Sequence, residues 1–154
     1  MKTRTIVLVL TSLCICVALG SAADLSVGTW KLNEAKSKIN PGDAKNTTVV
    51  YEAVGDSFKV TIDGVDGKGN PTHSGWTGKF DGKDYPAVGD PKTDTRALTK
   101  VDEHTLMLTN KKDGKVTSTG KIVFAADGKS RILTAWGTDA SGKKVEDVFF
   151  YDKQ

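Results

Sequence analysis

The amino-acid sequence predicts an all-β protein: an antiparallel up-and-down β-barrel of about 8–10 strands, preceded by an N-terminal signal peptide. Three observations predict the barrel. Apolar and polar residues alternate with a period of two, turn-forming residues separate the alternating runs, and no segment after residue 23 keeps apolar residues at helical spacing over three turns.

The first 23 residues have the features of a secretory signal peptide. A basic start (Lys2, Arg4) precedes an apolar stretch, and the small residues Ser21-Ala22-Ala23 stand before Asp24. We therefore expect cleavage near Ala23. The mature domain then comprises residues 24–154, has a secreted or periplasmic location, and makes no stable membrane insertion.

Two alternatives to cleavage remain open. Residues 6–23 are just long enough to span a bilayer as an uncleaved anchor. The chain is a lipoprotein if Cys16 is acylated, although Ile15 stands before it where a small residue is expected.

The mature domain has little net charge and no cysteine. The whole chain has 22 Lys and Arg against 19 Asp and Glu. Two of the cations lie in residues 1–23, which leaves a charge of +1 on residues 24–154. This balance argues against nucleic-acid binding, which needs clustered positive charge. Both cysteines, Cys14 and Cys16, lie in the signal segment, so no disulfide is expected, and we expect a monomer.

Ten runs of residues are predicted to be strands. The clearest is 57–63, where Phe58, Val60 and Ile62 alternate with polar residues. The others are residues 27–32, 47–54, 73–80, 84–88, 95–101, 105–109, 116–124, 132–137 and 145–151.

Short turns connect most of these runs. Gly55-Asp56 predicts a two-residue hairpin, and Asp-Gly-Lys recurs at residues 66–68, 81–83, 113–115 and 127–129. A meander of about ten strands tends to close, which removes its exposed edges. A two-sheet sandwich is the alternative. Residues 33–38 are predicted to form one helical turn over a barrel end, stopped by Pro41-Gly42.

The segment Gly28-Thr29-Trp30-Lys31-Leu32 resembles the Gly-x-Trp opening of lipocalins, and more closely that of small secreted bacterial lipocalin-like domains. The Tyr85-Pro86 pair and the Tyr151-Asp152-Lys153 ending extend the resemblance. It implies a lipocalin-like barrel with a central cavity, and no particular activity.

The resemblance also implies a structural role for three residues. In lipocalins the motif tryptophan packs at the closed end of the barrel beneath an arginine from a late strand. Gly28 and Trp30 match the motif, and Arg131 is the candidate arginine. If Ile132 and Trp136 face inward, however, Arg131 faces outward, so the orientation of this strand stays open.

The sequence contains no recognisable catalytic or metal-binding constellation. Its two histidines, His73 and His104, lack acidic residues at metal-ligand spacing, and no nucleophile elbow or phosphate loop occurs. We expect no metal, no cofactor and no enzymatic activity. Asp147 is the one acid that could support a barrel enzyme, if it faces inward with Val145 and Phe149.

The aromatic residues give the best indication of function. We predict that a lumen is lined by Tyr51, Phe58, Trp76, Leu108 and Trp136. The predicted function is binding of a small apolar or amphipathic molecule in that lumen. The alternative is a filled barrel that binds a protein or envelope component through residues 64–70 or 89–94 at its open end.

Overall fold

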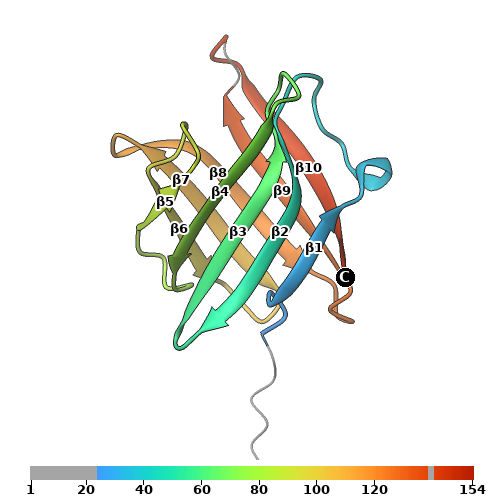
Figure 1. The fold of residues 1–154 in the computed structure, drawn as a ribbon, viewed down its shortest axis with the longest axis vertical. Coiled ribbons are helices and arrows are strands. Elements are labelled where there is room, and N and C mark those ends of the chain that lie inside the picture. Colours follow the sequence, from blue (N-terminus) through green and yellow to red (C-terminus); the bar gives the residue numbers. More distant parts are fainter. Residues whose placement is uncertain (1–23, 139–140) are drawn as a thin grey trace, which may run out of the picture.

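Ten antiparallel strands close into one β-barrel in the computed structural model, which describes residues 24–138 and 141–154 (Figure 1). The predicted up-and-down barrel is thus confirmed. The expected signal segment, residues 1–23 with both cysteines, lies outside the described residues. In chain order the strands are β1 (Gly28–Leu32), β2 (Lys45–Val54), β3 (Ser57–Val65), β4 (Pro71–Gly78), β5 (Tyr85–Val88), β6 (Thr95–Lys100), β7 (Thr105–Lys112), β8 (Lys115–Phe124), β9 (Ser130–Thr138) and β10 (Lys144–Lys153).

Each strand pairs with its neighbours in the chain, and β1 pairs with β10 to complete the barrel. Trp30 lies opposite Lys153 in β10 and Val49 in β2. Closure removes the exposed sheet edges that a sandwich would keep. The shortest strand, β5, makes the shortest pairings, and its Pro86 has no N–H to donate to a neighbouring strand.

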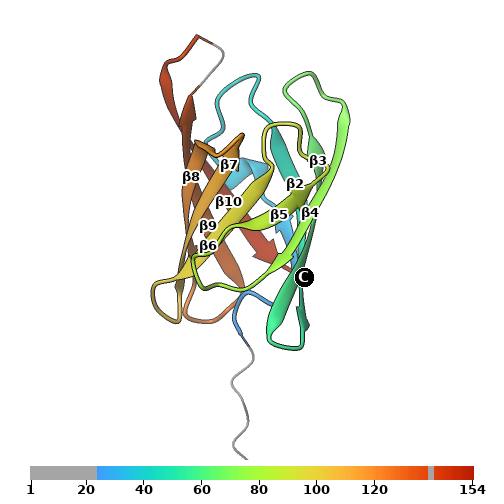
Figure 2. The same ribbon diagram turned by 90° about the vertical axis from the view of Figure 1, so that its left-hand side faces the viewer.

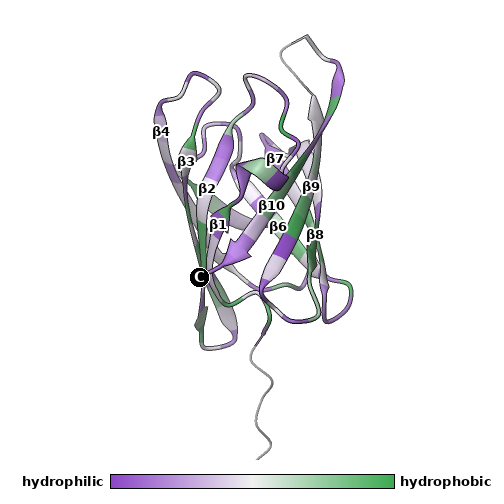
Figure 3. Cartoon of the chain, turned by 90° about the vertical axis from the view of Figure 1, so that its right-hand side faces the viewer, coloured by the Kyte–Doolittle hydropathy of each residue, from purple (hydrophilic) through white to green (hydrophobic). Residues whose placement is uncertain are grey.

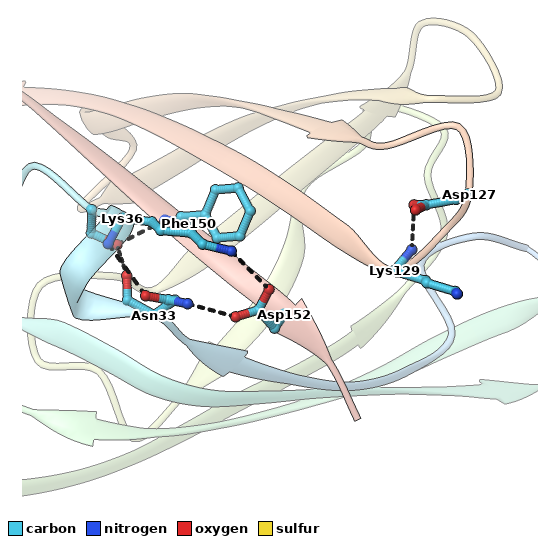
Figure 4. A network of polar contacts seen from close by, with 7 residues as sticks. Asn33, Lys36, Asp127, Lys129, Phe150 and Asp152 are labelled. Carbon is cyan, nitrogen blue, oxygen red and sulfur yellow. Dashed lines mark hydrogen bonds and ion pairs between the residues drawn. The ribbon is translucent and has the colours of Figure 1, made fainter.

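The connections gather at the two ends of the barrel, as Figure 2 shows. The end formed by the loops after β1, β3, β5 and β7 is called the loop end below. The opposite end, where β2 turns into β3 and β8 into β9, is called the closed end. At the β8–β9 turn, Oδ1 of Asp127 accepts the N–H of Lys129 at 2.9 Å (Figure 4). Gly128 between them has φ +66°, which a side chain would disfavour.

A single 3-10 turn, η1 (Glu34–Lys36), lies against the outer face of β10 (Figure 4). Asn33 caps the turn and donates from Nδ2 to Oδ2 of Asp152 at 2.7 Å. The Lys36 ammonium lies 4.6 Å from the centre of the Phe150 ring.

The helical turn predicted in residues 33–38 is therefore present, with two differences. It lies beside β10 rather than over a barrel end, and it stops at Lys36, before Pro41-Gly42. The reason is that Lys38 already forms a β-bridge with Val148 of β10. Within the described residues, no helix has the length and apolar character needed to cross a membrane.

Side chains alternate between lumen and solvent along the strands, as the period of two predicts. On β3, Val60 and Ile62 are buried, whereas Lys59 and Asp63 are exposed. Figure 3 shows the same alternation as hydrophobic and hydrophilic segments that follow one another along the strands. The core therefore lies inside the barrel, and its lining determines what the protein can bind.

Candidate functional site

The lumen contains a cavity of about 320 Å³ that reaches the loop end. Its deeper wall is apolar and includes Trp76, Leu98 and Ile122. At its mouth lie polar residues from the loops, among them Asp43 and Asp90. A volume of about 300 Å³ is at the lower end of the range for small-molecule pockets.

The closed end is filled by packed side chains. Trp30 is fully buried, its indole Nε1 donates to the Ser26 carbonyl at 2.8 Å, and its ring lies 5.5 Å from that of Phe124. The Arg131 guanidinium lies 5.0 Å from the Trp30 ring and 4.7 Å from the Tyr151 ring. These contacts seal the barrel below the cavity.

Gly28 accommodates a lysine that helps to close this end. A Cβ at Gly28 would lie 2.7 Å from Cε of Lys153, and φ is +126°, so both space and backbone favour glycine. The Lys153 ammonium can thereby reach the Leu25 carbonyl at 3.3 Å and lie 5.1 Å from the Trp30 ring. The Gly28–Trp30 spacing thus serves packing rather than ligand contact.

Four of the five predicted lining residues, Tyr51, Trp76, Leu108 and Trp136, border the cavity. Phe58 does not. It lies at the closed-end start of β3, where its ring stacks on Phe80 with the ring centres 4.1 Å apart. Its inward phase was correctly predicted, but its position along the strand places it below the cavity.

The inward orientation predicted for Trp136 is wrong. The residue borders the cavity, but its side chain is 37% exposed, and its Nε1 donates to Glu146 on the outer face of β10 at 2.6 Å. Leu133 and Ala135 pack against the core instead, so β9 has the opposite phase. Arg131 therefore points inward, as the lipocalin resemblance requires.

Sequence reasoning missed Arg96, a cation in the wall of the cavity. Its Nε donates to Oδ1 of Asn110 at 2.7 Å, and Nδ2 of Asn110 donates to Oγ of Ser118 at 2.9 Å. Burial lowers the pKa of the Arg96 guanidinium below its usual range. The alternation along the strand could have revealed this inward orientation, because Arg96 lies two residues before the buried Leu98 and therefore on the same face.

Two carboxyl groups meet at the mouth. Asp147 is buried, and its Oδ1 accepts the backbone N–H of Asn40 at 2.7 Å and Nδ2 of the same residue at 2.9 Å. Burial, followed by the neighbouring Asp147 carboxyl, raises the pKa of Asp43 above its usual value. Asp147 thus has the inward phase that the sequence left open, and it fastens the loop of residues 37–44 to β10.

The histidines lie away from this cavity. His73 is exposed, with Nδ1 2.6 Å from Oδ1 of Asp63 on the outer surface. Neither His73 nor His104 borders the lumen. Among the described residues, no group of three His, Cys, Asp or Glu is placed to hold a metal ion.

A second hollow, of about 470 Å³, lies on the outer surface over β3, β4 and β5. It is larger than the lumen cavity, but its polar residues Lys59 and His73 are exposed to solvent. The lumen offers polar groups inside an apolar enclosure, which is the arrangement that orients a small ligand. We therefore take the lumen as the candidate site.

Comparison with known proteins gives matches in structure alone. No protein-family model and no curated protein sequence matches the chain. The solved structure of EF1p2_mFAP2b bound to DFHBI is similar, with a TM-score of 0.51 and 14% identity, covering 86% of this chain and 97% of that one. Apocrustacyanin C1 (TM-score 0.46, 15% identity) aligns over 88% of this chain and 64% of its own. Lobster apocrustacyanin A1 has a TM-score of 0.43 and 15% identity, and the alignment covers 86% of this chain and 63% of that one.

The closed up-and-down antiparallel barrel, with one sealed end and one open end, is a lipocalin-like fold. In fold, the chain is therefore a lipocalin-like β-barrel with ten strands, at the upper limit of the predicted number.

Proposed function

We propose that the protein is a secreted or periplasmic binding protein that holds a small amphipathic molecule in its barrel lumen and performs no catalysis. The observation that carries the proposal is the open cavity of about 320 Å³, with an apolar wall beneath a polar mouth. EF1p2_mFAP2b, a barrel of similar fold, was solved bound to DFHBI, which supports a binding function for this barrel.

The open cavity also favours a binding protein over the alternative function. An interaction module that acts through its loops has no need of a lumen, and its barrel would be expected to be filled by side chains. In this barrel the side chains pack the closed end and leave space above Trp76 and Leu98.

A fluorescent probe of suitable size should bind to the lumen saturably. We expect 1-anilinonaphthalene-8-sulfonate to show a fluorescence increase that saturates at one site per chain. Trp76→Ala should change its affinity at least several-fold, because the ring is 4% exposed and borders the cavity. Phe150→Ala removes a ring from the outer face of β10, where it does not border the cavity, and should change the affinity less than twofold. Equal effects of the two substitutions would contradict lumen binding.

Export should remove residues 1–23. When the full chain is expressed in a bacterium with a periplasm, we expect a soluble periplasmic product whose mass and N-terminal sequence begin at Asp24. A membrane-bound chain of full mass would show an uncleaved anchor instead. A lipid-modified chain beginning at Cys16 would show a lipoprotein.

A further inference from the structure

Arg96 is a cation inside the barrel, and it has no acidic partner among the described residues. It retains some accessible surface, but that surface faces the lumen, since the residue borders the cavity and protein encloses it. The ion pairs found among the described residues are made by lysines, and neither Arg96 nor Arg131 takes part in one. A charge enclosed in this way is costly unless an opposite charge or hydrogen-bond acceptors meet it.

Most of the Arg96 guanidinium is available to a ligand. A guanidinium has five N–H donors in a planar fork, and within the described residues Arg96 uses one of them, Nε–H, to bind Asn110. The bond to Asn110, which is itself held by Ser118, fixes the orientation of the fork. A preoriented fork with free donors suits carboxylate, sulfonate and phosphate groups, which accept two parallel hydrogen bonds.

Within the part of the chain that the structure describes, the other charged residues of the cavity do not pair with Arg96, so its guanidinium can bind an anion that enters the cavity. Asp90 also borders the cavity and favours the charged form of Arg96, but it makes no ion pair with Arg96 in the described structure. Asp147 is engaged by Asn40 at the mouth. The second arginine, Arg131, adds positive charge at the floor, where its guanidinium lies against aromatic rings.

The strand register places this cation between the mouth and the apolar wall. Arg96 lies opposite Asn110, whereas the next inward position of β6, Leu98, lies opposite Leu108 and nearer the closed end. Trp76 and Ile122 line the cavity with these two leucines. A molecule with one anionic end would therefore meet the cation with that end while its apolar part lies deeper.

We propose that the ligand is an amphipathic anion whose carboxylate, sulfonate or phosphate group binds Arg96 and whose apolar body lies deeper in the lumen against Trp76, Leu98 and Leu108. This inference rests on the proposed lumen-binding function and names its ligand class. Tyr51, whose ring borders the same cavity, is the neighbouring hydroxyl that can donate to the anion.

Two probes that differ in charge test the proposal. 1-Anilinonaphthalene-8-sulfonate is anionic, and N-phenyl-1-naphthylamine has the same aromatic body without the sulfonate. Arg96→Met keeps an unbranched apolar stem at this position and removes the charged guanidinium. We expect it to weaken binding of the sulfonate about tenfold or more and to change binding of the neutral probe less than threefold, because a hydrogen-bonded charge contact is lost in one case only.

Lys121→Met is the matched control. Lys121 is exposed on the outer face of β8, does not border the cavity, and its loss changes the net charge by the same amount. It should change the affinity for either probe less than threefold. If Lys121→Met equals Arg96→Met, the effect is a general electrostatic one and the inference is overturned. Equal weakening of both probes by Arg96→Met would likewise overturn it, since the arginine would then only shape the cavity.

A competition experiment in the unmodified protein tests the proposal even if Arg96→Met does not fold. It measures how well two ligands displace the neutral probe. Decanoate and decanol have the same chain, and decanol is the more apolar. We expect decanoate to displace the neutral probe at a concentration at least about tenfold lower than decanol. Displacement at equal concentrations would overturn the anion site and leave the lumen as a binding site. If neither probe binds, both proposals fail.

Discussion

Replacing Trp30 by alanine is expected to lower the free energy of unfolding by about 3–5 kcal/mol, the range for truncating a large buried aromatic side chain. Trp30 is fully buried, and the substitution removes its hydrogen bond to the Ser26 carbonyl and its contact with Phe124. It also takes away one of the rings that face the Arg131 guanidinium. Since a domain of this size has about 5–15 kcal/mol of stability in all, the variant should be close to unfolding.

Trp136→Ala is the matched control for this prediction. It removes the same side chain from the outer face of β9, where the indole is 37% exposed and makes one hydrogen bond to Glu146. We expect a loss of about 1 kcal/mol or less, typical of an exposed position. Urea unfolding followed by circular dichroism measures both variants. Equal losses would contradict the structural role assigned to Trp30 at the closed end.

The fold could be predicted because local patterns and long-range packing require the same arrangement. The alternation in residues 57–63 fixes which face of β3 is inside, and Gly55-Asp56 supplies a turn short enough to bring β2 and β3 together. Asp113-Gly114 does the same between β7 and β8, whereas longer Gly-containing loops join β3 to β4 and β8 to β9. A closed meander can then be predicted from the alternation and the turns alone, because each strand pairs with its neighbours in the chain.

The phase of β9 could not be predicted from apolarity. Residues 131–137 have apolar side chains on both faces, with Ile132 and Trp136 on one and Leu133 and Ala135 on the other. The structure places the larger pair outside, where exposed apolar residues are common. The contact of Arg131 with the Trp30 ring and the bond of Trp136 to Glu146 both favour this phase, and both depend on other strands.

The site was predicted only where it consists of strand side chains. Tyr51, Trp76 and Leu108 follow from alternation. The polar mouth comes from loops, such as that of Asp43, which have no periodicity to reveal where their side chains point. Arg96 was overlooked because a charged residue in a strand is ordinarily expected to face solvent.

Raising the pH from 10 to 12 should lower the stability of the protein through Tyr151. This side chain is fully buried, and its hydroxyl donates to the Asn46 carbonyl at 3.0 Å. Burial raises the pKa of Tyr151 to about 12, against the opposing effect of the Arg131 charge. In the unfolded chain a tyrosine ionises near pH 10. Between the two values the unfolded state loses the proton while the folded state keeps it, so stability falls as pH rises.

The expected contribution is about 2–3 kcal/mol by pH 12, at about 1.4 kcal/mol for each pKa unit. Tyr151→Phe isolates it from the other groups that titrate in this range. At pH 9 the variant should be about 1 kcal/mol less stable than the wild type, because it lacks the hydrogen bond to Asn46. As the pH rises, only the wild type loses the Tyr151 contribution, so in urea unfolding the two stabilities should converge and then cross. Parallel curves would mean that the hydroxyl ionises equally well in both states, which a fully buried ring beside the closed end does not allow.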